Sequence, residues 1–579
     1  MAEFYREASS FDGWRGTFMI RILPIALLFG AAILNGAFLF FGNSSVFPLG
    51  VFDGVFFAVL FFFFALYRPG WAFLVFLAVL PFEIVNLAPE VFPVSIRPYQ
   101  LFGAAILGSL LVRFVFRRHS FPFVSFRWFD ALVLVFIFGS LISLFFAPDL
   151  SIAGKQTVVV VSYVGLYVLS REFLNTANDV RRIIPFLILS ALGAIFFAMW
   201  QSARFTAGLS SFEVMAGRPN AFFSEPDWLG MYLIFVGSSA LALLFFFLEQ
   251  KYFKEEEALG IRNNENEFGK KAVGDAERHS DVSYNSFALI LSSFFLGVSF
   301  LGLLLTVARS AWVGFFVSLV IFLKLLLFQK YGFIAREWRW GLLAKGVGIV
   351  SLTLSLAPFV VWAFRLTTFE LSGRAGSAVS GFQEITISCG APVSLPEKIG
   401  NVSDLFAYGC RHIRLEEIES ERRAEKFVTT ILRPDPSIEA RRLIREKTFL
   451  TLRENWVLGI GWGNIGSVLG TDDRGARYNA SNAFLEVWLG GGILSLLSFL
   501  ALWLLMPFLS VRFFFAHDSG SDARAVAVFF LVSWGGCTVF NFFNSGILLG
   551  FFWVWLGSIG MLLSEKKLPR ESLIQKKLS

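Results

Sequence analysis

The sequence predicts an all-α polytopic membrane protein with about 12–14 transmembrane helices and one large extracytoplasmic loop subdomain. Of its 579 residues, 56% are apolar and only 16% are charged, whereas about a quarter of the residues in soluble domains are charged. The chain is also rich in aromatic residues, with 73 Phe, 16 Trp and 11 Tyr. Disordered, collagenous and disulfide-rich classes are excluded by the same composition.

Apolar runs of about 20 residues are long enough to cross the hydrocarbon core of a bilayer. Each such run is expected to be helical, because no open strand edge survives in lipid. Fourteen predicted spans lie near 22–42, 50–67, 70–87, 99–116, 129–147, 156–170, 183–200, 228–248, 285–305, 309–328, 342–364, 482–508, 525–543 and 546–563.

The connecting segments predict the orientation, because cytoplasmic loops collect Lys and Arg. With the N-terminus inside, the short outer segments hold few cations: Arg97, Lys155, Arg204, Arg218 and Arg309. The inner segments hold many more, from Arg6, Arg15 and Arg21 to Lys566, Lys567, Arg570, Lys576 and Lys577. Both termini are therefore predicted to be cytoplasmic. The net charge of +7 needs no nucleic-acid partner, and no nucleic-acid-binding motif is present.

Two hydrophilic stretches separate the apolar runs. Residues 249–284 are charged and rich in Asn, which predicts a flexible cytoplasmic loop. Residues 366–480 have mixed charge and helical patterns near 413–432 and 438–454, which predicts a folded subdomain over the outer ends of the helices. The predicted divisions are N-terminal helices 1–200, central helices 201–365, the loop subdomain 366–480, C-terminal helices 481–563 and a cytoplasmic tail 564–579.

Two of the three cysteines, Cys389 and Cys410, fall in the outer loop. An oxidising compartment would allow them to form a disulfide, although spacing alone does not fix the geometry that a disulfide needs. Cys537 falls within a predicted span and is expected to be a small core residue.

The candidate functional residues lie at the predicted outer surface. The chain has no metal-ligand spacing, no Walker loop and no nucleophile elbow, and only four His. Four polar stretches lie at outer ends of spans: Arg218-Pro-Asn-Ala-Phe-Phe-Ser-Glu225-Pro-Asp227, Thr306-Val-Ala-Arg309-Ser-Ala-Trp312, Arg441-Arg442 followed by Gly459-Ile-Gly461-Trp-Gly463, and Ser481-Asn482-Ala-Phe-Leu485-Glu486.

These stretches resemble, in order, the motifs of the O-antigen ligase and Wzy-type polysaccharide polymerase superfamily. The family's Arg-x-x-Gly-Thr-Phe-x-Asn-Pro-Asn stretch matches 218–227 in spacing, with Glu-Pro-Asp where Asn-Pro-Asn is usual. Its Thr-x-Ser-Arg turn is similar to 306–312. Its Arg-bearing helix with a Gly-x-Gly-x-Gly turn is similar to 441–463, with Trp456 where Pro is common. Its His-Asn-x-x-Leu element is similar to 481–485, with Ser481 in place of His.

The resemblance implies a membrane glycosyltransferase of the inner, cytoplasmic membrane whose active site faces outside. The donor would be a polyprenyl-pyrophosphate-linked glycan, and the acceptor would be the hydroxyl of another glycan or of a lipid. Family enzymes use neither a metal nor another cofactor at this step. Loss of the His favours a polymerase slightly over a ligase.

Arginines are suited to the chemistry that this function requires. Without a metal, the charge that grows on a pyrophosphate leaving group must be neutralised by guanidinium groups, which stay protonated and bind phosphate bidentately. The candidates are Arg218, Arg309 and either Arg441 or Arg442. Arg309 lies in a gap between two apolar runs, where a charge is costly without a partner. The alternatives are head-group snorkelling for Arg309, a loop charge for Arg218 and a solvated helix face for Arg441 and Arg442.

The acceptor hydroxyl needs a base or a hydrogen-bond acceptor, and Ser481 cannot be a base at neutral pH. Asn482 and Ser481 are expected to contact substrate. Carboxylates at Glu225, Asp227 and Glu486, together with His412, are the candidate replacements for the base.

Two other functions stay open on the sequence alone. A lipid-linked glycan flippase can also have about fourteen spans, although the chain lacks the internal repeats that are frequent in transporters. A non-catalytic membrane protein of the same fold is the third possibility.

Overall fold

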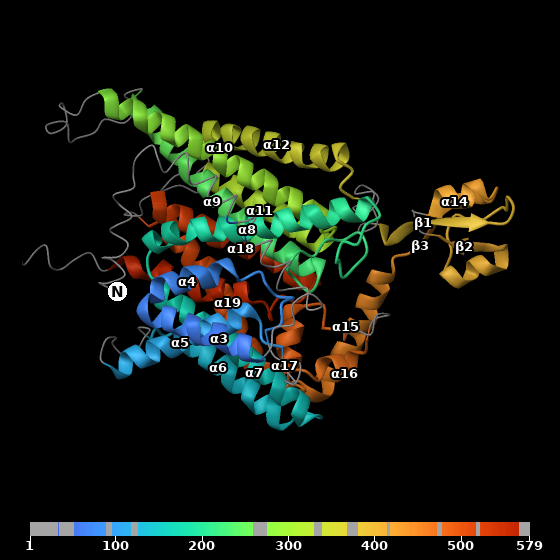
Figure 1. The fold of residues 1–579 in the computed structure, drawn as a ribbon, viewed down its shortest axis with the longest axis horizontal. Coiled ribbons are helices and arrows are strands. Elements are labelled where there is room, and N and C mark those ends of the chain that lie inside the picture. The colour runs from blue at the N-terminus through green and yellow to red at the C-terminus, as the bar shows by residue number, and fades with distance from the viewer. Residues whose placement is uncertain are drawn as a thin grey trace, which may run out of the picture.

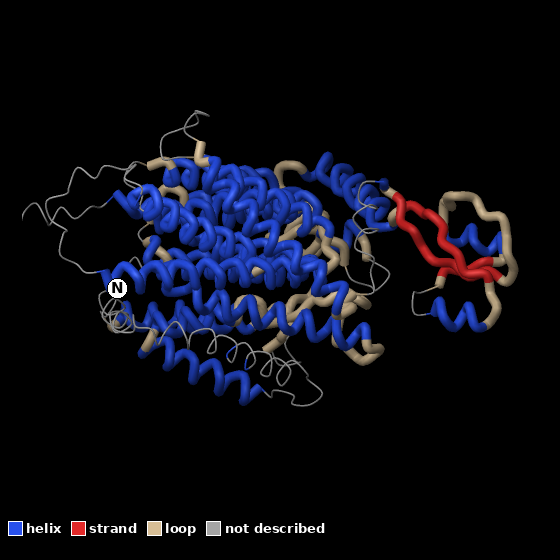
Figure 2. The backbone as a smooth tube through the Cα atoms, turned by 90° about the horizontal axis from the view of Figure 1, so that it is seen from above, coloured by secondary structure: helices blue, strands red, loops and turns tan. Residues whose placement is uncertain are grey.

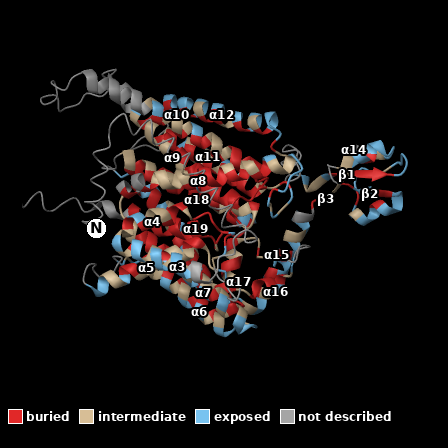
Figure 3. Cartoon of the chain, viewed as in Figure 1, coloured by how far each residue is buried: buried red, intermediate tan, exposed pale blue. Residues whose placement is uncertain are grey.

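The structure is a bundle of long helices with a small three-stranded sheet standing beyond one end (Figure 1). It is a computed structural model that describes residues 30, 33, 51–87, 95–116, 126–258, 275–328, 338–367, 380–413, 417–471, 477–516 and 521–566. Buried residues fill the middle of the bundle (Figure 3). A view turned by 90° also places the sheet outside the bundle (Figure 2).

The helices follow the apolar runs of the sequence. Before the sheet they are α3 (Val51–Tyr67), α4 (Pro69–Ala78), α5 (Pro98–Val115), α6 (Asp130–Phe145), α7 (Leu150–Phe173), α8 (Ala177–Thr206), α9 (Pro226–Ala258), α10 (Asp275–Leu305), α11 (Arg309–Leu327) and α12 (Trp340–Ala363). After it come α15 (Pro436–Asn455), α16 (Ile465–Leu469), α17 (Ala483–Phe514), α18 (Ser521–Phe543), α19 (Gly550–Gly557) and the 3₁₀ helix η4 (Ser558–Lys566).

Within the described ranges, nine helices are long and apolar enough to cross a membrane, and four shorter apolar helices accompany them. The chain is therefore a polytopic α-helical membrane protein, as the composition predicts. Thirteen of the fourteen predicted spans coincide with one of these helices. The remaining one, 22–42, falls almost entirely outside the described residues.

Charged side chains from distant segments meet at the two ends of the bundle. At one end, Glu249 of α9 pairs with Arg339 (3.2 Å) and with Arg524, and all three side chains are buried. The sequence places these three residues on one side of the membrane. At the other end, next to the sheet, Arg309 pairs with Asp435, and the sequence assigns both of these residues to the opposite side.

The predicted loop 249–284 is wrong at both edges. Helix α9 continues to Ala258 and α10 begins at Asp275, so only 259–274 lies outside the described residues. The reason is composition, because the segment Lys-Tyr-Phe-Lys-Glu-Glu-Glu-Ala after the apolar run contains mostly strong helix formers.

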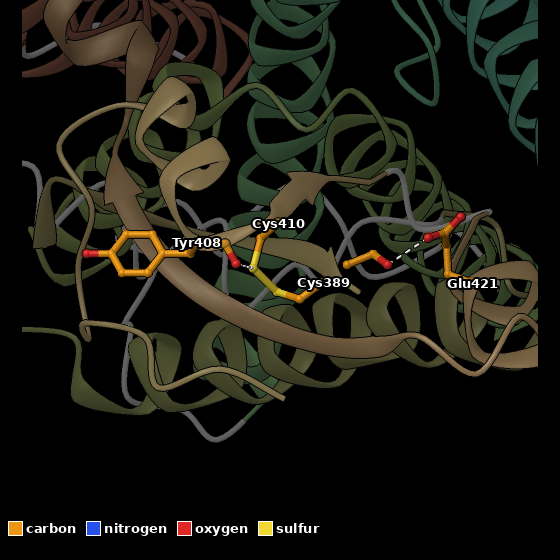
Figure 4. The surroundings of a disulfide bond; sticks show 5 residues. Cys389, Tyr408, Cys410 and Glu421 are labelled. Atoms are coloured by element: carbon orange, nitrogen blue, oxygen red, sulfur yellow. Dashed lines mark hydrogen bonds between the residues drawn. A yellow bond between two sulfur atoms is a disulfide. The ribbon is translucent and has the colours of Figure 1, made fainter. Parts of the chain in front are cut away.

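The sheet belongs to the predicted loop subdomain and comprises β1 (Phe382–Cys389), β2 (Cys410–His412) and β3 (Phe427–Pro434) in the antiparallel order β2-β1-β3. The 3₁₀ helix η2 (Val402–Tyr408) and the short α14 (Ile418–Arg423) complete it. A disulfide joins Cys389 to Cys410 across the β1–β2 pair (Figure 4).

The helix predicted near 413–432 is found only as the short α14 and is wrong from Phe427 on, where β3 begins, whereas the one near 438–454 corresponds to α15. Residues 427–431 read Phe-Val-Thr-Thr-Ile, and β-branched and aromatic residues favour strands. Pairing with β1 along the whole of β3 makes the strand the stable choice. The sheet projects beyond the helix ends, whereas the later helices of the subdomain, α15 and α16, contact α17 (Figure 1).

Helix α17 contains a sharp bend that the single predicted span 482–508 does not anticipate. Gly492 has φ of 71° inside the helix, and the ring of Phe484 before the bend contacts Phe499 and Trp503 beyond it. The backbone of 457–460 fills the bend, with hydrogen bonds from Ile493 N to Val457 O and from Ile460 N to Leu489 O.

The turn Gly459-Ile-Gly461-Trp-Gly463 packs against helices. All three glycines have positive φ, and a Cβ on Gly461 would meet that of Ala147 at 2.7 Å. Gly461 N donates to Ser143 Oγ, and Trp462 Nε1 donates to Ser140 Oγ, both at 3.0 Å. Close packing against helices therefore explains the glycine at 461.

Candidate functional site: an arginine cluster beside a pocket

Close packing of two helix ends brings the first two polar motifs together. Gly230 in α9 lies so near α11 that a Cβ would meet the Cβ of Ala311 at 2.8 Å and that of Ala308 at 3.2 Å. The start of α9, with Asp227 in its first turn, therefore lies beside the turn 306–308 that leads into Arg309. Small residues at this crossing place two motifs that are 80 residues apart at one end of the bundle.

Arg218 is held by both motifs. Its Nη2 atom lies 2.7 Å from Asp227 Oδ1, and its Nε donates to the carbonyl oxygen of Thr306 at 3.1 Å. The loop that carries Arg218 is fixed from inside, because Asn220 is fully buried and Ala221 N donates to Gln201 Oε1 at 2.7 Å. Arg218 is thus a well-anchored guanidinium rather than a free loop charge.

Arg309 connects the helix bundle to the subdomain. Its Nη1 atom lies 2.6 Å from Asp435 Oδ2, and the carboxylate is almost completely buried. Asp435 stands between Pro434, the last residue of β3, and Pro436, the first residue of α15. A single ion pair therefore connects the end of the sheet, the start of α15 and the start of α11.

Arg441 and Arg442 follow each other on α15 but face different surroundings. Arg442 is mostly exposed and lies 3.8 Å from Glu439 on the same helix. Arg441 is partly buried, and burial lowers the pKa of its guanidinium. The choice that the sequence leaves open is therefore decided by geometry, and Arg441 is the inward-facing arginine.

The neighbours of Arg441 define what we call the arginine cluster: Arg218, Arg309, Arg441, Asp227 and Asp435. The positive charges of Arg309 and Arg218 add to the lowering of the pKa of Arg441, whereas Asp227 and Asp435 oppose it. Arg218 and Arg309 each contact a carboxylate, and Arg441 lies within the electrostatic influence of both aspartates and both other arginines.

Arg441 also lines a pocket of about 620 Å³, which we call the Arg441 pocket. Helix α15 contributes Arg441, Arg445 and Phe449, which are four residues apart and therefore share one face. The opposite walls come from the entry and bend of α17 and the end of α18: Ala480, Ser481, Asn482, Phe484, Leu485, Leu500, Phe542 and Phe543. Two of the lining residues, Arg441 and Arg445, are cationic, Ser481 and Asn482 are polar, and the others are apolar.

The fourth motif reaches the Arg441 pocket through Ser481 and Asn482 but not through Glu486. Asn482 begins α17, and its Oδ1 accepts from the backbone N of Phe484 and Leu485, both at 3.0 Å. Glu486 is buried, and its Oε2 accepts from Ala480 N at 2.6 Å. The structure thus places this carboxylate on the backbone that enters α17, while Ser481, with φ of 49°, turns the chain beside the pocket.

Two other candidates for the base lie apart from the Arg441 pocket. Glu225 precedes α9, and its carbonyl accepts from Trp228 N and Leu229 N. His412 is in β2 of the sheet, where burial and the nearby Arg433 lower the pKa of its imidazole. Of the sequence-predicted carboxylates, Asp227 contacts an arginine of the cluster, Arg218.

Sequence reasoning missed Asp435 and the aromatic walls of the pocket. An Asp before Pro at the start of a predicted helix is a helix-start signal, and the first candidate arginine of that helix follows six residues later. That pattern predicts a carboxylate at the start of the helix, but its contact with Arg309 depends on the fold. Phe449, Phe542 and Phe543 carried no such signal, because Phe is abundant throughout the chain.

Comparisons with known proteins supply no further residues. No family model and no curated protein matches the chain. Within the described ranges, no group of three His, Cys, Asp or Glu side chains is arranged to hold a metal ion. The function is therefore argued from the arginine cluster and the Arg441 pocket alone.

Proposed function

We propose that the chain transfers a glycan from a polyprenyl pyrophosphate to an acceptor hydroxyl, at the membrane face where the arginine cluster lies. The observation that carries the proposal is the composition of the Arg441 pocket. Arg441 and Arg445 line it together with Phe and Leu side chains from α15 and from two candidate spans, α17 and α18. A diphosphate attached to an isoprenoid chain suits this combination, because it has an anionic head and an apolar tail.

The three arginines of the cluster support a role in departure of the pyrophosphate. The acceptor oxygen attacks the anomeric carbon, the bond from that carbon to the pyrophosphate oxygen breaks, and the electron pair leaves with the pyrophosphate. A pre-placed guanidinium stabilises the charge that develops. Arg218 and Arg309, each held by an aspartate, would keep the positive field in place around Arg441.

The proton of the acceptor hydroxyl needs a destination. Asp227 is the sequence-predicted carboxylate in the cluster, and it is only partly buried. Asp227 therefore accepts the proton in this proposal, or holds the hydroxyl while the proton passes to the leaving pyrophosphate. Polymerase and ligase reactions share this step and differ only in the acceptor.

The sharpest test compares the two adjacent arginines of α15. Purified protein in detergent receives a polyprenyl-pyrophosphate oligosaccharide, and the readouts are glycan length and released carrier. Arg441→Ala is expected to lower the rate by about 100-fold or more, and Arg442→Ala to change it by no more than about twofold. Arg309→Ala should also abolish transfer.

Equal rates in Arg441→Ala and Arg442→Ala would remove the basis of the proposal. A flippase is the second candidate, because an amphipathic pocket also suits carriage of a lipid-linked glycan. In proteoliposomes, transbilayer movement of intact donor without any new glycosidic bond would identify a flippase and reject the transferase.

A further inference from the structure

A second cleft lies in the projecting sheet, away from the Arg441 pocket. It has a volume of about 370 Å³, which is within the range of small-molecule pockets. Polar lining residues are Glu384, Glu397, Thr429 and Thr430, and Phe427 supplies an aromatic ring. Val393, Leu395, Pro396, Ile431 and Leu432 complete the walls.

The cleft opens at the free edge of β3. The strand order β2-β1-β3 leaves one side of β3 without a strand neighbour. Among the described residues, the segment 393–399 makes backbone hydrogen bonds to β3 only at Leu432, whose N donates to Glu397 O and whose O accepts from Ile399 N. Beyond that point the two segments separate, and the cleft lies between them.

Because the direction of the backbone N–H and C=O groups alternates along a strand, further backbone groups of β3 point into the cleft. The N–H and C=O of one residue point to the same side of an antiparallel strand, and the side alternates with each residue. Because those groups of Leu432 point away from β1, those of Thr430 do so as well. The cleft therefore combines backbone donors and acceptors of β3 with lining residues that carry hydroxyl, carboxylate and aromatic groups.

We propose that this cleft binds a neutral oligosaccharide, the acceptor or growing glycan of the proposed transfer reaction, on which this inference rests. Carboxylates and hydroxyls are strong partners for sugar hydroxyls, and a flat ring such as that of Phe427 suits the C–H face of a sugar. The two glutamates repel phosphate, so the pyrophosphate head belongs in the Arg441 pocket and only the glycan belongs here.

The chain connects the two sites directly. Strand β3 runs from the cleft to Pro434, and the next residue, Asp435, pairs with Arg309 in the arginine cluster. Thr430 is five residues from Asp435, or about 17 Å along the strand. A glycan of several sugars that starts at the arginine cluster would reach the cleft along β3.

An extended peptide is the alternative occupant, because a free strand edge can pair with one. The segment 393–397 forms the other wall of the cleft and closes it at Leu432, so there is no room for a strand along the full length of β3. This enclosure favours a short, compact ligand such as one or two sugars.

The test uses the full chain in lipid nanodiscs and saturation-transfer NMR. The probe is the set of oligosaccharides released by mild acid from the surface polysaccharide of cells that carry the chain. Phe427→Ala and Glu397→Gln are expected to lower oligosaccharide binding by about fivefold or more. Matched controls on the same subdomain, Phe406→Ala and Glu425→Gln, lie outside the cleft and should bind normally.

The outcomes separate this inference from the proposed function. Transfer activity without cleft-dependent binding overturns the glycan cleft and leaves the transferase standing. Binding lost in Phe427→Ala but retained in an inactive Arg441→Ala supports the cleft independently of transfer. If only an extended peptide, Lys-Thr-Lys-Thr-Lys, binds in a Phe427-dependent way, the β3 edge is a peptide site and the glycan assignment is wrong. Retention of the Cys389–Cys410 disulfide verifies that each variant has folded.

Discussion

Arg441 and Arg442 have the same side chain and differ by one position on α15, yet only Arg441 reaches both the arginine cluster and the Arg441 pocket. Successive positions on a helix point about 100° apart. On α15, Arg441, Arg445 and Phe449 share the face that lines the Arg441 pocket, and Arg442 lies beside Glu439 in solvent. A count of charges along the sequence treats all these cations alike, so it cannot predict which of them faces the pocket.

The ion pair between Asp435 and Arg309 is expected to stabilise the junction between subdomain and bundle. Replacing Asp435 with Asn keeps the shape but removes the charge opposite Arg309, 2.6 Å away. A hydrogen bond between charged groups contributes about 2 kcal/mol, so thermal unfolding in detergent should occur at a lower temperature. Glu439→Gln, at an exposed carboxylate, is the control. An equal change in unfolding temperature in both variants would show that the ion pair of Asp435 stabilises the protein no more than an exposed one does.

Glu213 predicts a pH dependence of the loop that carries Arg218. Burial raises the pKa of this carboxyl to about 7, and its Oε2 accepts from Gly217 N at 2.8 Å. The folded loop therefore retains a proton that the unfolded chain loses near pH 4.5, so the stabilisation is fully present below pH 4.5 and falls as the pH rises to 7. Proteolysis of the loop should increase between pH 5 and pH 8 in the wild type.

The control for this prediction is Glu213→Gln, which has no proton to lose. Its loop should be cleaved at the same rate at both pH values, after correction for the pH dependence of the protease itself. A wild-type loop that is equally resistant at pH 5 and pH 8 would contradict the raised pKa.

At the scale of elements, the bend in α17 and the glycine turn that fills it position one wall of the Arg441 pocket. Gly461 has φ of 77° and lies against Ala147 and Ala153. Gly461→Ala is expected to cost about 2 kcal/mol through overpacking and backbone strain. Thermal unfolding of the purified variant measures the loss.

Gly154 in α7 is the matched control, because a Cβ there meets nothing within 4 Å. Gly154→Ala should leave the unfolding temperature unchanged or raise it slightly, since Ala favours helix. Equal stability of the two variants would mean that the close contact at Gly461 does not constrain the turn.

The sequence predicted most helices because hydrophobic length alone determines whether a segment can cross lipid. Its predictions failed where contacts between distant segments determine the local structure. Pairing with β1 turns 427–434 into a strand, and the backbone of 457–460 stabilises a bend at Gly492 that three consecutive glycines only permit. Similarly, four polar motifs were recognisable, but the aspartate that joins Arg309 to α15 emerged only from the folded chain.

At the scale of the whole molecule, charged segments sort to two ends. Glu249, Arg339 and Arg524 meet at one end, and the arginine cluster and the sheet lie at the other (Figure 1). Segments that the positive-inside pattern assigns to one side are therefore neighbours in space. Which end faces the cytoplasm follows from that pattern alone, and it is a prediction.

Single cysteines at the two ends test this orientation. Arg442→Cys lies beside the arginine cluster, and Trp340→Cys lies at the opposite end at an exposed position. A membrane-impermeant maleimide should label Arg442→Cys in intact cells and Trp340→Cys only after permeabilisation. Native background should be low, because Cys389 and Cys410 form a disulfide and Cys537 is buried. The reverse pattern would place the arginine cluster in the cytoplasm.

The most direct test of the central claim is the affinity of the purified protein for polyprenyl pyrophosphate compared with the uncharged polyprenol. Both ligands can fill the apolar part of the Arg441 pocket, but only the pyrophosphate can use Arg441. The wild type and Arg442→Ala should prefer the pyrophosphate by at least about tenfold, and Arg441→Ala should lose that preference. Equal affinity of the wild type for the two lipids would contradict the claim that these arginines hold a diphosphate.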